Sequence, residues 1–230
     1  DLMAFDSSTR ELLGTRMWHV NLQGTQNQFA CISFNGDVVK TQLAPSQGAL
    51  NLRFLSDRHL VDVFSATKAS KLPPMPTGGW RQVRAIPAFS RLSRRLSQVM
   101  VPHAEYEVVR TKILFNGLLT RALALLGNHQ PSAGRMMSRY GEFYFSFVLA
   151  ADVQSWLGFD GRQFVAGQGH CPQPTTLTIE FSDLETAGLA ASGKLDQLAA
   201  IGSGRLRVTG LTPLGDTLDI LLDRIDQYLR

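Results

Sequence analysis

The second half of the chain has the clearer hydrophobic pattern. Leu177, Ile179 and Phe181 alternate with other residues, which is typical of a strand with one buried face. Similar patterns predict strands over residues 143–151, 154–159, 162–168 and 205–211. Helices are predicted over residues 111–126, 183–191, 196–201 and 216–229. Gly127-Asn128 would end the first of these helices, because glycine and asparagine adopt the left-handed conformation of a C-cap.

The closing helix carries an apolar stripe at steps of three and four residues. Its acidic residues lie on the opposite face, so the helix is expected to pack on one side only. The stripe consists of Leu214, Leu218, Leu221, Leu222, Ile225 and Leu229.

The two halves of the chain are also similar to each other. Leu50 to Phe54 alternate as Leu177 to Phe181 do, and Asp57 and Asp183 follow at the start of a short helix. An offset of about 125 to 127 residues is kept throughout, which favours an internal duplication over a chance match. The same offset pairs Gly79 with Gly204, Val83 with Val208, and Ala85 with Gly210.

Two units are therefore predicted, over residues 1–104 and 105–230. The first begins with a strand over residues 15–23 and ends with a helix near residues 89–100. Its opening helix is reduced to a few residues around Thr9–Leu13. The prolines of the segment 72–76 also replace a short helix, because proline does not continue one.

Composition indicates an ordinary folded protein. Of the 230 residues, 44% are hydrophobic and 18% are charged, which excludes a disordered chain. No apolar stretch approaches the roughly 20 residues of a membrane-spanning helix. Cys31 and Cys171 lie too far apart in sequence to suggest a disulfide framework, and no signal peptide is visible, so a cytoplasmic setting is expected. The net charge of +4 arises from a basic excess in the first half.

The sequence shows no catalytic signature, phosphate-binding loop or metal motif, so no cofactor and no metal are expected. His170 and Cys171 adjoin, but adjacent residues of an extended chain point to opposite faces, and a loop cysteine is the favoured interpretation. Arg91, Arg94 and Arg95 share one helix face. They are interpreted as a solvated face, with transient contact to an anionic membrane as the alternative. Few aromatic residues interleave with them, which argues against a nucleic-acid partner.

The segment 177–210 carries a family resemblance. An alternating strand is followed by Gly193-Lys194-Leu195 and then by Gly204-Arg205-Leu206-Arg207-Val208-Thr209-Gly210. This order resembles that of the sterol-carrier-protein-2 (SCP2) family, strongly over residues 111–230 and more weakly over residues 15–100. The resemblance implies an α+β fold with two SCP2-like units in tandem. Each unit would have a mainly antiparallel five-stranded sheet, covered by helices that enclose an apolar cavity.

The resemblance further implies a non-enzymatic binding or carrier protein for a lipid, fatty acid or sterol-like molecule. The alternatives are an interaction module with a vestigial cavity, or an accessory domain of an enzyme system. The second unit, with its full opening helix, is expected to hold the ligand, and the first to serve as its packing partner. The sheet would contribute Phe145, Phe147, Leu177, Ile179, Leu206 and Val208, and the closing helix Leu214, Leu218, Leu221, Leu222 and Ile225.

Overall fold

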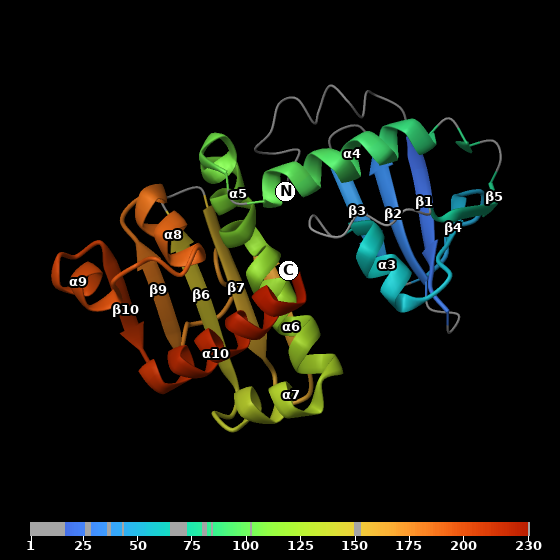
Figure 1. Ribbon diagram of the computed structural model, residues 1–230. Helices are drawn as coiled ribbons and strands as arrows, with labels where there is room; N and C mark the ends of the chain where they lie inside the picture. Colours follow the sequence, from blue (N-terminus) through green and yellow to red (C-terminus); the bar gives the residue numbers. More distant parts are fainter. Residues whose placement is uncertain are drawn as a thin grey trace. The chain divides into compact units, whose positions relative to one another are not determined.

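A computed structural model describes residues 17–25, 29–35, 38–42, 44–64, 73–79, 82–83, 85–101, 103–149 and 153–229. The chain divides into two compact units after Val101 (Figure 1). Thr9–Leu13, where the reduced opening helix was predicted, lies outside the described residues.

The first unit is a five-stranded sheet with strand order β3-β2-β1-β4-β5. Central strand β1 pairs antiparallel with β2 and parallel with β4. The edge strands β3 and β5 are antiparallel to their neighbours. Its described elements are β1 (Trp18–Gln23), β2 (Phe29–Asn35), β3 (Val38–Gln42), β4 (Leu50–Arg53), α3 (Asp57–Phe64), β5 (Met75–Gly78) and α4 (Ala85–Met100).

The core of the first unit lies on one face of this sheet. Trp18, Val20 and Leu22 alternate along β1 and point into it, and the ring of Trp18 stacks on that of Phe34 at 3.8 Å. Helix α4 adds Phe89, which meets Trp18 edge-on at a ring distance of 6.4 Å. Each such buried side chain contributes about 1.5–3 kcal/mol relative to an exposed one. The core therefore fixes which face of the sheet α4 covers.

The second unit is also built on a five-stranded sheet, with order β10-β9-β6-β7-β8. Its described strands are β6 (Phe143–Leu149), β7 (Val153–Phe159), β8 (Phe164–Gln168), β9 (Leu177–Phe181) and β10 (Leu206–Gly210). Its helical segments are η2 (Ala104–Tyr106), α5 (Glu107–Ile113), η3 (Leu114–Leu118), α6 (Leu119–His129), α7 (Pro131–Ser138), α8 (Leu184–Ala191), α9 (Gln197–Gly202) and α10 (Thr212–Leu229).

The two sheets have the same topology. In each, the first strand pairs antiparallel with the second and parallel with the fourth. The parallel pairs also correspond, since Val20 lies opposite Leu50 as Phe145 lies opposite Leu177. The predicted α+β class, with two mainly antiparallel five-stranded sheets and covering helices, is confirmed.

The last strand of the first unit does not lie at the position that the constant offset between the units predicted. Val83 is exposed in a turn outside any strand, and β5 ends at Gly78. The structural counterpart of Gly210 is Gly79, not Ala85. A Cβ on Gly79 would lie 1.9 Å from the Ala49 carbonyl oxygen, and one on Gly210 would lie 2.1 Å from that of Thr176. The segment between α3 and β5 is shorter than its equivalent in the second unit, so the pairing of Gly79 with Gly204 is wrong.

The helix predicted to end at Gly127 continues to His129. Gly127 is buried inside it, where a Cβ would lie 2.5 Å from Cδ2 of Phe164 and 2.7 Å from Cε of Met137. This glycine therefore permits close packing and does not end the helix. The break lies upstream, in η3, where Gly117 has a φ of 121°. Helix α7 follows and was not predicted.

Candidate apolar ligand-binding face

The six predicted strand residues lie on one face of the second sheet, the inner face. Phe145 lies opposite Leu177, and Phe147 opposite Ile179. Ile179 in turn lies opposite Val208, because β9 and β10 pair antiparallel. Directly paired residues of neighbouring strands project to the same side of a sheet. The predicted floor of the site is therefore assembled as one apolar surface.

Helix α10 lies across this surface (Figure 1). Leu214 and Leu221 are fully buried, Leu218 and Ile225 are nearly so, and Leu222 is half-buried. The start of the helix packs on β9, where a Cβ on Gly215 would lie 3.5 Å from Cδ2 of Leu177. The apolar stripe thus packs inward, as predicted, and encloses the side chains beneath it.

A hydrogen-bond network fastens the beginning of α10. Arg139, just after α7, donates from Nη2 to the Thr217 hydroxyl at 2.9 Å. Tyr140 donates its hydroxyl to the Pro213 carbonyl at 2.6 Å. The Arg139 guanidinium also lies 4.8 Å from the centre of the Tyr140 ring. These contacts hold the N-terminal turn of the helix in place over the sheet.

A kinked helix covers another part of the inner face. Ser155 donates its hydroxyl to the Phe115 carbonyl, and Gln168 donates its side-chain amide to the Asn116 carbonyl, both at 2.6 Å. The kink interrupts the regular helical hydrogen bonds, and these two side chains satisfy carbonyls at the break. A Cβ on Gly117 would lie 3.0 Å from Cγ of Gln168, so the kink also allows close approach to the sheet.

Two aromatic residues that were not among the predicted site residues complete this region. Phe115 lies between Phe147 and Phe181, with ring distances of 5.1 and 4.9 Å. Phe181 could have been found from its i+2 spacing to Ile179, which places it on the same face. Phe115 gave no such signal, because its position depends on the kink.

The inner face is incompletely covered in the middle of β9 and β10. Leu177 is fully buried and Phe181 is 5% exposed, but Ile179 between them is half-buried. Its partner Val208 is half-buried too, whereas Leu206 on the same side of β10 is 7% exposed. An aliphatic pair therefore keeps some solvent contact, between two buried residues of β9 and beside one buried residue of β10.

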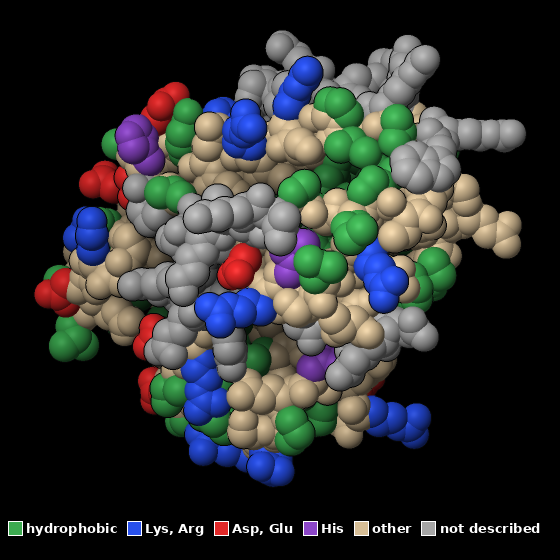
Figure 2. Space-filling view, turned by 45° about the vertical axis from the view of Figure 1, so that its right-hand side comes forward, with side chains coloured by type: hydrophobic (Ala, Val, Ile, Leu, Met, Phe, Trp, Pro, Cys, Tyr) green, Lys and Arg blue, Asp and Glu red, His purple; other side chains and the backbone are tan. Residues whose placement is uncertain are grey.

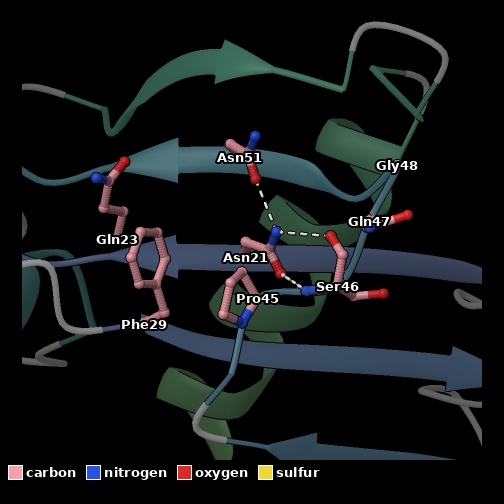
Figure 3. A pocket seen from close by; sticks show the side chains of 8 residues that line it. All are labelled: Asn21, Gln23, Phe29, Pro45, Ser46, Gln47, Gly48 and Asn51. Atoms are coloured by element: carbon pink, nitrogen blue, oxygen red, sulfur yellow. Dashed lines mark hydrogen bonds between the residues drawn. The ribbon is translucent and has the colours of Figure 1, made fainter.

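A pocket in the described residues lies in the first unit, and most of the residues that line it have polar side chains (Figure 3). It has a volume of about 380 Å³ and opens over the sheet face opposite the core, beside Phe29 and Pro45. The nearly buried Asn21 donates to the Ser46 carbonyl at 3.0 Å and to Oδ1 of Asn51 at 2.8 Å. It also accepts from the Ser46 amide at 3.0 Å. Asn21 thus fastens the loop that crosses from β3 to β4, and this pocket differs from the apolar cavity that was predicted.

The crossing loop of the second unit contains the adjacent pair His170 and Cys171. Cys171 is buried and His170 is exposed, and burial raises the pKa of the Cys171 thiol. A raised pKa disfavours the thiolate, which is the nucleophilic form of cysteine. Within the described part of the chain, no group of three or more His, Cys, Asp or Glu residues is arranged to hold a metal ion.

The basic residues of α4 lie on its outer side. Arg91 and Arg94 are exposed and Arg95 is half-buried, while Phe89 and Leu92 pack against the core of the first unit. Figure 2 shows Lys and Arg side chains separated by hydrophobic and neutral ones on the face that it displays. None of the described helices is both long enough and apolar enough to cross a membrane.

Comparison with known proteins gives structural similarities only. No family model matches the sequence, and no curated protein matches it. A crystal structure of sterol carrier protein 2 is similar to 48% of this chain and 95% of its own, with 21% identity and a TM-score of 0.36. Palmitated SCP2L2 from Aedes aegypti is similar to 50% of this chain and 93% of its own, with 24% identity and a TM-score of 0.32. An inverting sec-alkylsulfatase from Pseudomonas sp. is similar to 34% of this chain and only 12% of its own, with 19% identity and a TM-score of 0.28.

Proposed function

We propose that this protein binds and carries a lipid or another hydrophobic small molecule, without catalysis, against the inner face of its second sheet. The observation that supports this most directly is the exposure pattern of β9. Ile179 and Val208 are solvent-accessible aliphatic side chains on a face where most neighbouring side chains are buried. An apolar ligand that enters beside them would remove this surface from water.

The chemistry of the face suits a ligand with an acyl chain or fused rings. The six predicted strand residues are aliphatic or phenylalanine, so binding would be driven by burial of apolar surface, at about 0.8 kcal/mol for each buried CH₂ group. A ligand with a polar head group would keep that group in water and bury its tail.

The two units have different roles in this proposal. Their shared strand order and pairing directions support descent from one duplicated domain. Five of the eight residues that line the Asn21 pocket have polar side chains, which supports assigning the hydrophobic ligand to the second unit. The first unit would then bind no hydrophobic ligand. Arg91, Arg94 and Arg95 would add transient contact with anionic lipid head groups, at about 1 kcal/mol for each basic residue near the surface.

One alternative has an observation in its favour. Leu177, Leu214 and Leu221 are all 0% exposed, as expected for a solid core. In an interaction module with a vestigial cavity, α10 would be permanently packed on the sheet and no ligand would enter.

A binding experiment on the full chain separates these possibilities. Protein purified from cells would be extracted for lipid, and then titrated with a fluorescent fatty acid. Ile179→Asn should weaken uptake of the probe at least about tenfold, because a polar amide would replace a ligand contact. Val165→Asn is the matched control: Val165 is equally half-buried but lies on β8 with its side chain on the outer face. It should leave uptake unchanged.

Leu221→Ala tests the packing of α10 by denaturant unfolding of the full chain. Truncating a fully buried leucine should lower the free energy of unfolding by about 2–5 kcal/mol. If the wild type carries no lipid and takes up no probe, the interaction module is the better description. If Ile179→Asn and Val165→Asn bind the probe equally well, the ligand does not lie where we place it.

A further inference from the structure

Helix α9 presents two aliphatic side chains to solvent. Leu198 is 83% exposed, which is the highest value among the large hydrophobic side chains of the described residues, and Ile201 is 48% exposed. Residues three apart lie on the same side of a helix, so the two side chains form one small apolar patch on the surface. Ala200 on the opposite side is fully buried. The helix therefore packs on the protein through Ala200, and its two large side chains, Leu198 and Ile201, point outward.

The turn is rigidly held. The Asp196 carboxylate accepts from the Ala199 amide at 3.0 Å, which caps the N-terminus. At the other end, the Arg205 amide donates to the Ala200 carbonyl at 2.9 Å, and the chain enters β10 directly. Leu198 and Ile201 are thus presented by a fixed scaffold, and their exposure does not come from a loose loop.

The small size of this apolar patch indicates which kind of partner it suits. A specific protein interface buries about 1,200–2,000 Å² in total, several times more than two aliphatic side chains offer. The boundary between head groups and acyl chains of a bilayer needs no matching shape, and small apolar protrusions insert there. Of the nearby acidic groups, Asp196 accepts the capping hydrogen bond of α9 and Glu180 lies 3.6 Å from Arg207. Lys194 and Arg205 are exposed beside the turn, so cationic side chains accompany the acidic ones at this surface.

We propose that α9 is a membrane-contact site, at which Leu198 and Ile201 insert into the interface of a lipid bilayer. This rests on the proposed function, because contact with a bilayer is useful to a protein that collects or delivers a lipid. It also extends that function: α9 leads directly into β10, which carries Val208, so the incompletely covered part of the ligand-binding face belongs to the strand that follows the membrane contact.

Flotation of the full chain with vesicles tests the proposal. The wild type should float with pure phosphatidylcholine vesicles, and added salt should change this little, because the contact is apolar. The double variant Leu198→Ser/Ile201→Ser should lower the vesicle partition coefficient about tenfold or more, since two aliphatic side chains no longer leave water. The matched control is Leu125→Ser/Val108→Ser, which removes two other aliphatic side chains of the same unit, each 55% exposed. It should float like the wild type.

Depth measurement adds an independent readout. A nitroxide on Leu198→Cys should gain accessibility to oxygen relative to a water-soluble relaxation agent when vesicles are added, and one on Leu125→Cys should not. Equal flotation of the double variant and the wild type would overturn the proposal. So would flotation that requires phosphatidylglycerol and disappears with salt, which would assign the contact to the arginines of α4.

The two proposals fail in distinguishable ways. The Leu198→Ser/Ile201→Ser protein should still take up the fluorescent fatty acid in solution, because neither side chain lies on the inner face. If the wild type binds no fluorescent fatty acid but still floats with vesicles, the proposed ligand binding is wrong and the proposed membrane contact is unaffected.

Discussion

The replacement of Gly79 by alanine tests whether Gly79 has the same structural role in the first unit as Gly210 has in the second. Gly79 and Gly48 both have a φ of 73°, so both are in the left-handed region that side chains disfavour. They differ in their surroundings. A Cβ on Gly79 would lie 1.9 Å from the Ala49 carbonyl oxygen and 2.8 Å from Cα of Leu50, whereas one on Gly48 would meet nothing within 4 Å.

The two positions therefore separate backbone strain from steric overlap. Gly48→Ala should cost only the conformational term, about 1–2 kcal/mol. Gly79→Ala should cost that amount plus the overlap with backbone atoms, which are not free to rotate away. Because β5 would have to move off β4, we expect a total loss of about 3 kcal/mol or more, in the upper part of the range for point mutations.

Hydrogen exchange measured peptide by peptide suits this two-unit chain, because it reports the opening free energy of each unit separately. Gly79→Ala should accelerate exchange in β1 and β2 far more than Gly48→Ala does. Gly210→Ala, whose Cβ would lie 2.1 Å from the Thr176 carbonyl oxygen, should do the same to β6 and β9. Equal losses for Gly79→Ala and Gly48→Ala would refute the steric argument, and with it the equivalence of Gly79 and Gly210.

Two further predictions concern ionisable groups. The Ser182 hydroxyl, followed by the Thr186 amide, lowers the pKa of the Asp183 carboxyl, which caps α8. Since its folded pKa lies below the unfolded one, the stabilisation is present at neutral pH and is lost as the pH falls through the folded pKa. The protection factors of the α8 amides, which compare their exchange with that of the unfolded chain at the same pH, should therefore fall in acid. Asp183→Ala should remove this response at a cost of about 1 kcal/mol. Alkylation of Cys171 by iodoacetamide, followed by mass spectrometry, should be slower than that of an unstructured cysteine peptide. A rate equal to that of the peptide would contradict the burial and raised pKa of this thiol.

The strand alternation explains why so much of the second unit could be predicted from sequence. In Leu177–Phe181, every second residue is large and apolar, and the register places these residues on the buried side. The inward stripe of α10 followed from its three- and four-residue spacing in the same way. Local periodicity is sufficient wherever one face of an element meets the core.

Other features depended on contacts between distant segments. The offset between the units changes at β5, because the linker before that strand is shorter, and only strand pairing reveals that Gly79 takes the place of Gly210. Gly127 resembled a helix end in sequence, but it is buried against Phe164 and Met137. The half-burial of Ile179 could not be predicted from sequence either, because Ile179 and Leu177 have the same position in the strand alternation.

The parallel pairing of β6 with β9 has a consequence for synthesis of the chain. Strand β6 is central in the finished sheet, but its partner on one side begins at Leu177, which is opposite Phe145. The antiparallel meander β6-β7-β8 can pair as soon as it leaves the ribosome, and β6 is then an open edge of phenylalanine-rich strand. The 32 residues from Phe145 to Leu177 take about 2–6 s to be made at the usual rate of translation. During that interval an unpaired strand edge is available to other chains, so the growing chain is open to aggregation through β6 before β9 arrives.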